Sequence, residues 1–162
     1  MNILEFALEK ERLSREYYQQ LAAKAQNPGL HNILVMLAEE ESHHCHIIED
    51  MRSHIPVHLA ETNILGKAKN IFNNIKESVD QFDFSISEAE LYRNARDKEQ
   101  KSMEFYKQKA AQADDETQRE IFLKLANEEQ KHLIVIDNIY EFVESPQRYL
   151  ENAEFVHAAE DF

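Results

Sequence analysis

Apolar residues recur every three or four positions in four long stretches of the chain, and this spacing places them on one face of an α-helix. Short polar turns separate the first stretch from the second and the third from the fourth. We therefore predict an all-α protein whose helices lie at about residues 2–27, 30–54, 87–113 and 115–144.

Local signals mark the ends of these helices. The turn NPG (27–29) should end the first helix, because proline cannot continue it and glycine tolerates left-handed backbone geometry. Ser87 stands three residues before Glu90, which predicts a capping box at the start of the third helix. Asp114 or Asp115 is expected to cap the fourth helix.

The connection between the second and third helices, residues 57–84, is long for a helical bundle. As a helix it would span about 42 Å at 1.5 Å per residue, enough to run the length of a bundle. We therefore predict a crossover from one end to the other, with the second and third helices parallel. Part of it should be an amphipathic helix, because helical spacing joins Ile64, Ala68, Ile71, Ile75 and Val79.

The chain also contains an internal repeat. At a shift of 88 residues and without a gap, ERLSREYYQQLAAKA (11–25) aligns with EQKSMEFYKQKAAQA (99–113), and LAEEESHHCHIIEDM (37–51) aligns with LANEEQKHLIVIDNI (125–139). Each half is therefore predicted to be a helix hairpin. The predicted organisation is a single domain at 1–162, with repeat 1 at about 2–55, a crossover at 56–86, repeat 2 at about 87–144 and a short C-terminal tail at 145–162.

The apolar face of every predicted helix is interrupted near its middle by glutamate, and two faces also carry histidine one turn later. The first helix has Leu4, Ala7, Glu11, Ser14, Tyr18, Leu21 and Ala25, and the third has Tyr92, Ala95, Glu99, Ser102, Tyr106, Ala110 and Ala113. The second has Leu30, Leu34, Leu37, Glu41, His44, Ile48, Met51 and Ile55, and the fourth has Phe122, Leu125, Glu129, His132, Ile136, Ile139 and Val143.

A buried carboxylate without a partner is very costly, so four of them at one level require positive charge between them. Two divalent ions would balance four glutamates, and histidine adds a neutral nitrogen ligand. Glutamate and histidine at positions i and i+3 lie on one helix face, so both can reach the bundle axis. The candidate metal ligands are Glu11, Glu41, His44, Glu99, Glu129 and His132.

Glu40 and Glu128 each stand one residue before a candidate ligand. If the inward faces of the helices were assigned one position off, the candidate ligands would instead lie on a solvated face. Glu40 is followed three residues later by His43, but Glu128 is followed at that spacing by Lys131. Only the register chosen above gives histidine in both halves.

The composition mainly excludes certain partners, membrane spans and disulfides. The net charge of −13 argues against nucleic acid and anionic membranes as partners. The sequence has no apolar run long enough for a membrane span and no signal-peptide pattern, so we expect a cytoplasmic protein. The single cysteine, Cys45, excludes an intrachain disulfide and should be a small, half-buried apolar residue.

One glutamate from each of two helices and Glu-x-x-His from each of the other two is the ligand set of ferritin-like di-iron carboxylate bundles. The chain resembles this superfamily at all six positions. EKERLSREYYQQLA (9–22), LAEEESHHCHIIEDM (37–51) and the tail PQRYLENAEF (146–155) resemble the rubrerythrin group most. Bacterioferritins are similar in length and ligand set, but the spacing between their hairpin glutamates is usually longer. The resemblance implies a ferritin-like four-helix bundle.

The rubrerythrin resemblance implies an oxidoreductase that reduces hydrogen peroxide or dioxygen at two iron ions, although manganese and zinc suit the same ligands. The four glutamates would be its catalytic carboxylates. Tyr18 and Tyr106 would either donate hydrogen bonds to them or simply pack in the core. Many rubrerythrins carry a further carboxylate one turn after the third-helix ligand, where this chain has Ser102.

Full-length rubrerythrins resemble this bundle followed by a four-cysteine rubredoxin-type domain, which a sequence with one cysteine cannot supply. Electrons would then come from a separate donor, such as a rubredoxin-like protein. Two alternatives stay open: a ferroxidase or iron-handling protein of bacterioferritin type, and a non-enzymatic structural metal bundle. Storage needs a hollow shell, whereas a peroxidase needs only the homodimer that we expect.

Overall fold

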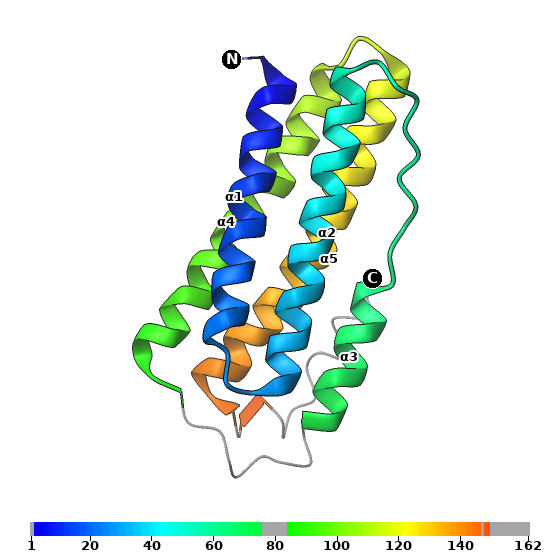
Figure 1. The fold of residues 1–162 in the computed structure, drawn as a ribbon. Coiled ribbons are helices and arrows are strands. Elements are labelled where there is room, and N and C mark those ends of the chain that lie inside the picture. The colour runs from blue at the N-terminus through cyan, green and yellow to red at the C-terminus, as the bar shows by residue number, and fades with distance from the viewer. Residues whose placement is uncertain (1, 76–83, 147, 150–162) are drawn as a thin grey trace.

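A computed structural model describes residues 2–75, 84–146 and 148–149 of the chain (Figure 1). These residues form five helices: α1 (Ile3–Lys24), α2 (Pro28–Arg52), α3 (Ile64–Ile75), α4 (Ile86–Gln112) and α5 (Glu116–Glu144). The prediction of an all-α protein is confirmed. The four long helices begin and end within three residues of their predicted limits.

The long helices form two antiparallel hairpins, α1 with α2 and α4 with α5, which lie side by side as a ferritin-like four-helix bundle (Figure 1). After α2 the chain returns along the outside of the bundle, so that α2 and α4 run in the same direction. This confirms the predicted crossover. The two helix pairs correspond to the two halves of the sequence repeat.

The crossover is partly helical, as the sequence predicts, and α3 packs against α2 and α5. Its buried residues include Ile64 and Ile75, while Val79 lies outside the described residues. Gly29 permits the close contact between α3 and the first turn of α2, because a Cβ atom there would lie 2.9 Å from Ile75 Cδ1.

The expectation that Gly29 ends α1 in left-handed geometry was wrong. Asn27 caps α2, Pro28 occupies its first turn, and no glycine among the described residues has a positive φ. Proline suits this position because the first helical N–H groups lack intrahelical acceptors in any case.

The capping box of α4 lies two residues earlier than predicted. Ser85 Oγ accepts a hydrogen bond from Glu88 N, and the Glu88 carboxylate accepts one from Ser85 N. Ser87 already belongs to the helix, so its spacing to Glu90 is not a cap. Asp115 caps α5, one of the two residues expected there. Ile55 lies beyond the end of α2 and is 51% exposed, which corrects its assignment to the apolar face.

The core consists of two apolar clusters at different levels of the bundle. One includes Tyr18, Leu21, Leu34, Leu37, Tyr92, Ala95, Val135 and Ile136, and the other includes Ala7, Leu8, Cys45, Ile48, Tyr106, Ala110, Phe122 and Leu125. In every long helix the candidate ligands fall between the residues of the two clusters. Apolar layers therefore close the polar layer from both sides. Beyond α5, the Tyr149 hydroxyl donates a hydrogen bond to Asn138 on that helix (2.8 Å).

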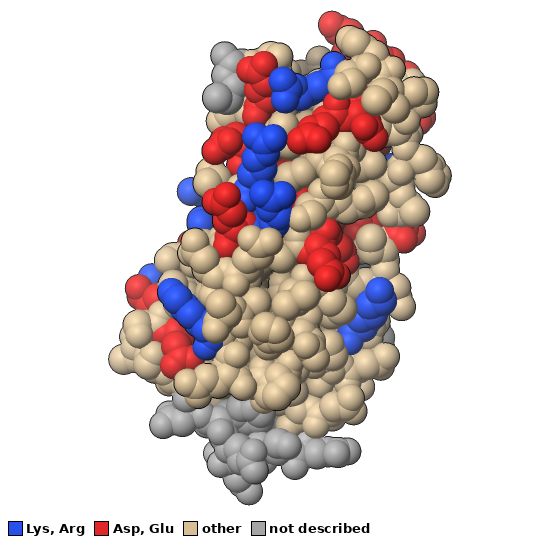
Figure 2. Space-filling model, viewed as in Figure 1, with Lys and Arg blue, Asp and Glu red and all other residues tan. Residues whose placement is uncertain are grey.

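Charged side chains gather on one half of the face shown in Figure 2, where α1 begins and α2 ends. Exposed ion pairs join Arg12 to Glu49 and Arg52 to Glu5 across the first hairpin. Such pairs contribute little to stability. Among the described residues, no helix has the length and apolar character needed to cross a membrane.

Candidate metal centre

The six candidate ligands meet in one buried layer at the middle of the bundle. Each long helix contributes its glutamate, and α2 and α5 also contribute the histidine one turn later. None of the six side chains is more than 3% exposed. A one-turn spacing on α2 and α5 is what allows both residues of each pair to point inward.

The six side chains form two overlapping sets, each with four potential ligand atoms within 4.8 Å of one another. The first set is Glu11, Glu41, His44 and Glu129, and the second is Glu41, Glu99, Glu129 and His132. Glu41 and Glu129 belong to both. Two metal positions that share two carboxylates are thus available, and each has one further glutamate and one histidine of its own.

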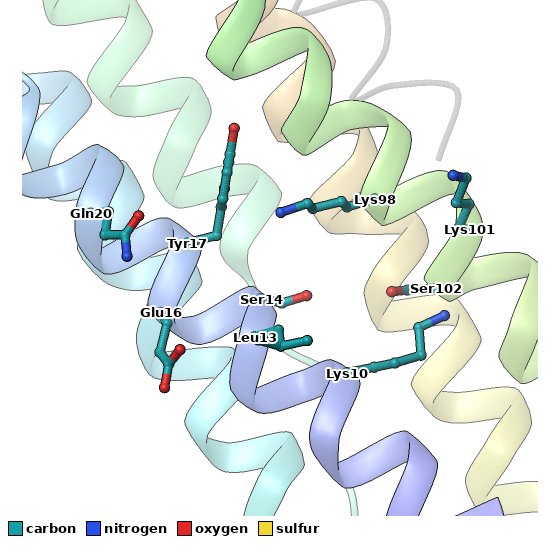
Figure 3. A pocket seen from close by; sticks show the side chains of 9 residues that line it. All are labelled: Lys10, Leu13, Ser14, Glu16, Tyr17, Gln20, Lys98, Lys101 and Ser102. Carbon is teal, nitrogen blue, oxygen red and sulfur yellow. The ribbon is translucent and has the colours of Figure 1, made fainter.

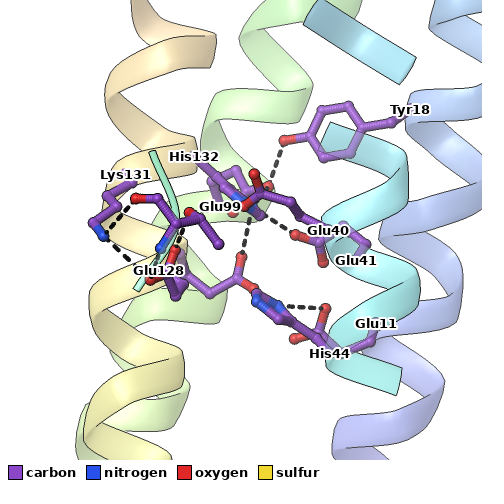
Figure 4. A network of polar contacts seen from close by, with 11 residues as sticks. Glu11, Tyr18, Glu40, Glu41, His44, Glu99, Glu128, Lys131 and His132 are labelled. Carbon is purple, nitrogen blue, oxygen red and sulfur yellow. Dashed lines mark hydrogen bonds and ion pairs between the residues drawn. The ribbon is translucent and has the colours of Figure 1, made fainter. Parts of the chain in front are cut away.

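The Nδ1 atoms of both histidines point to the shared glutamates. His44 Nδ1 lies 2.9 Å from Glu129 Oε1, and His132 Nδ1 lies 2.6 Å from Glu41 Oε1 (Figure 4). The two rings are nearly parallel, at 10°, with their centroids 5.6 Å apart. Each half of the repeat therefore binds its ring to a glutamate of the other half.

The donor set fits a pair of divalent cations. Among the described residues, the buried side-chain atoms that form no hydrogen bond of suitable geometry are Glu11 Oε2, Glu41 Oε1, Glu41 Oε2, Glu99 Oε2 and His132 Nδ1, although His132 Nδ1 and Glu41 Oε1 lie only 2.6 Å apart. All of them belong to this layer. Unsatisfied buried polar atoms are costly, and two divalent ions would both occupy these lone pairs and neutralise four carboxylates. The buried clusters can therefore hold two metal ions.

Without metal, protons supply part of the missing positive charge. Burial and repulsion by Glu11 raise the pKa of Glu41 well above its usual range, and the same two causes raise the pKa of Glu129. Burial alone would also raise the pKa of Glu11, but the neighbouring Glu41 and His44 lower it to about 2. The raised pKa values favour the protonated form of the shared glutamates, whereas metal binding requires the deprotonated form.

Tyr18 and Tyr106 connect the two hairpins at this layer. The Tyr18 hydroxyl on α1 donates to Glu99 on α4, and the Tyr106 hydroxyl on α4 donates to Glu11 Oε1 on α1 at 2.6 Å. Burial and the adjacent glutamates raise the pKa of both hydroxyls well above 10, so both remain donors. Each tyrosine is thus hydrogen-bonded to the glutamate that belongs to only one of the two ligand sets.

Sequence reasoning missed a second, partly buried polar cluster beside this layer. Its members are Glu40, Thr62, Glu128 and Lys131, and it adjoins the centre through His132 Nε2, which lies 2.8 Å from Glu40 Oε1 (Figure 4). The only signal in the sequence was the position of Glu40 and Glu128 next to the ligand glutamates. Nothing in the pattern pointed to Thr62.

A cavity of about 320 Å³ lies between α1 and α4 (Figure 3). Its lining includes two pairs of residues related by the repeat, Lys10 with Lys98 and Ser14 with Ser102. The serines stand one helical turn beyond Glu11 and Glu99. The cavity therefore approaches the carboxylate layer from the side of the bundle opposite to α3.

Comparisons with curated proteins and with solved structures gave no match. A scan against family models gave one for Rubrerythrin, over residues 2–140. The matched region contains both hairpins and all six candidate ligands, and it covers most of the chain. The chain belongs to the rubrerythrin family.

Proposed function

We propose that this protein is a di-iron oxidoreductase that reduces hydrogen peroxide or dioxygen with electrons from a separate donor. One observation carries the proposal: two buried ligand sets share Glu41 and Glu129. Two metals held by these residues would be able to act on one small oxidant together. When bound, two ferrous ions supply the two electrons that, with two protons, convert hydrogen peroxide into two water molecules.

The chain would contribute geometry, charge balance and a dry site. Glu11, Glu41, His44, Glu99, Glu129 and His132 would hold the metals, with Glu41 and Glu129 between them. Tyr18 and Tyr106 keep their protons and orient the outer glutamates, so they act as positioning residues. The apolar layers on both sides exclude water and strengthen every electrostatic interaction inside.

The cavity between α1 and α4 supports an approach path for the oxidant. It is large enough for a molecule the size of peroxide, and Ser14 and Ser102 offer hydroxyl groups one turn from the carboxylates. Ser102 is 6% exposed, so the inner part of the cavity is shielded from solvent. A small uncharged oxidant would enter such a space more readily than a hydrated ion.

The test is anaerobic loading of the metal-free protein with two equivalents of ferrous iron, followed by addition of peroxide or dioxygen. Optical spectra should show oxidation of two iron ions for each peroxide consumed. Glu41→Ala should abolish this reaction, because it removes a shared ligand. His43→Ala is the matched control, because His43 is exposed and lies off the inward face of α2.

Each outcome has a distinct meaning. Retained oxidation in the Glu41 variant would place the metals elsewhere, and equal loss in both variants would show that the register of α2 was misassigned. A wild-type protein that binds iron but does not react with either oxidant would contradict the oxidoreductase proposal and leave a structural metal bundle.

A further inference from the structure

The ligands of the two metal positions are related by the repeat, but their surroundings are not. Glu11 corresponds to Glu99, Glu41 to Glu129 and His44 to His132, and the tyrosines exchange hydrogen bonds in the same way. The difference lies on the side of the bundle along which the crossover passes.

His132 has a carboxylate behind it. Its Nε2–H donates to Glu40 Oε1 at 2.8 Å while Nδ1 faces the centre. In the part of the chain that the structure describes, the polar contacts of His44 run from Nδ1 only, to Glu129 and Glu11. A carboxylate on the far nitrogen fixes the tautomer and orientation of a metal-binding imidazole and makes it a stronger ligand.

The corresponding residue in the second half, Glu128, is engaged elsewhere. Its carboxylate accepts hydrogen bonds from Thr62 Oγ1 (2.7 Å), Thr62 N (3.2 Å) and Lys131 Nζ (3.2 Å) (Figure 4). Lys131 Nζ also donates to the carbonyl oxygen of Thr62 at 3.2 Å. Thr62 belongs to the crossover, which has no counterpart in the repeat. Because Thr62 and Lys131 hold Glu128, only His132 has a carboxylate, that of Glu40, hydrogen-bonded to its far nitrogen.

Charge strengthens the difference. Glu128 and Lys131 are both at least 94% buried and neutralise each other. Glu40 forms no ion pair with lysine or arginine within the described residues, and its contacts are with His132 and the Thr62 hydroxyl (3.3 Å). The histidine of the second ligand set, His132, is therefore hydrogen-bonded to an additional carboxylate, and within the described residues His44 has no such contact at its far nitrogen.

We propose that the two metal positions are inequivalent and that the position at His132 binds metal first, because Glu40 positions and polarises its histidine. The inference rests on the proposed di-metal function. Loss of a carboxylate in this role typically weakens metal binding 10- to 100-fold. We therefore expect affinities that differ by at least about 10-fold between the two positions.

The experiment titrates metal-free protein with Co²⁺ in competition with a chromophoric chelator, with the visible Co²⁺ bands as the readout. The wild type should bind two ions in separated steps. His132→Ala should lose the tighter step, and His44→Ala should lose the weaker one. Glu40→Gln should weaken the tighter step by about 10- to 100-fold and leave the other unchanged. Glu39→Gln, an equal loss of charge at an exposed neighbouring position, should change neither step.

Circular dichroism verifies the fold of each variant. Should Glu40→Gln not fold, the affinities of the two single-histidine variants still decide the order. A His132→Ala protein that binds Co²⁺ at least as tightly as His44→Ala would overturn the inference, as would equal weakening of both steps by Glu40→Gln. A wild type that binds no Co²⁺ would overturn the di-metal function as well, so the two failures are distinguishable.

Discussion

Glu41→Gln should stabilise the metal-free protein while it abolishes metal-dependent stabilisation. In the metal-free fold Glu41 is fully buried and its pKa lies well above the usual value of 4.5, because burial and then repulsion by Glu11 oppose its ionisation. Below pH 4.5 the carboxyl is protonated in both the folded and the unfolded protein. As pH rises, the unfolded chain releases this proton and the folded chain keeps it, so stability falls until the folded pKa is passed.

The magnitude follows from that difference. Each pH unit between the unfolded and folded pKa costs about 1.4 kcal/mol for one carboxyl. At pH 6.5, two units above the usual value, the raised pKa of Glu41 therefore lowers stability by at most about 2.7 kcal/mol, and glutamine has no such cost. The free energy of unfolding of the variant should exceed that of the wild type by up to this amount at pH 6.5 and by much less at pH 4.5.

The assay is urea unfolding of chelator-treated protein at both pH values, followed by far-ultraviolet circular dichroism because the chain has no tryptophan. Exposed Glu39→Gln is the control and should stay within about 0.5 kcal/mol of wild type. Added Zn²⁺ should stabilise the wild type but not Glu41→Gln. A metal-free variant no more stable than wild type at pH 6.5, or an advantage that is independent of pH, would refute this account of Glu41.

Three further predictions concern the centre. Metal removal should lower the melting temperature at neutral pH, since metal at a hundred times its Kd adds about 2.7 kcal/mol; an unchanged melting point after verified removal would contradict a buried site. Tyr106→Phe should cost about 1.5–3 kcal/mol in urea unfolding above pH 5. Because the pKa of Glu11 is lowered to about 2, this loss should shrink as pH falls from 4.5 toward 2, and a pH-independent loss would exclude the hydrogen bond as its cause. Ser102→Leu should narrow the cavity and slow peroxide-driven oxidation while Co²⁺ binding is retained, and an unchanged rate would contradict that approach path.

The repeat explains why so much of the centre could be predicted from the sequence. Two Glu-x-x-His motifs at a fixed shift determine the helix faces, and a helix face determines which side chains reach the bundle axis. Glu41 could be distinguished from its neighbour Glu40 because only Glu41 and its counterpart in the second half are both followed by histidine three residues later. The turn residues were less informative: Ser85 and Ser87 both stand three residues before a glutamate, and only the start of the helix decides between them.

The crossover could not be predicted in the same way. Its helix has apolar periodicity, but the position of Thr62 depends on how an irregular segment lies against α2 and α5. The burial of Lys131 follows from that contact, because its ammonium group is bonded to Thr62 and Glu128. Gly29 was misassigned for a related reason: its role is to admit α3, a contact between segments far apart in the sequence.

A duplicated hairpin supplies two equal sets of ligands, so any inequality between the metal positions must come from a segment outside the repeat. Here that segment is the crossover, because Thr62 holds Glu128 with two short contacts, whereas Glu40 remains hydrogen-bonded to His132. Two-electron reduction of peroxide requires both positions to be filled, whereas filling the tighter one requires less metal. Reactivity should then follow the weaker position at His44, and a partly loaded protein would hold metal without reducing peroxide. The same asymmetry that orders metal binding would make the reaction depend on metal supply.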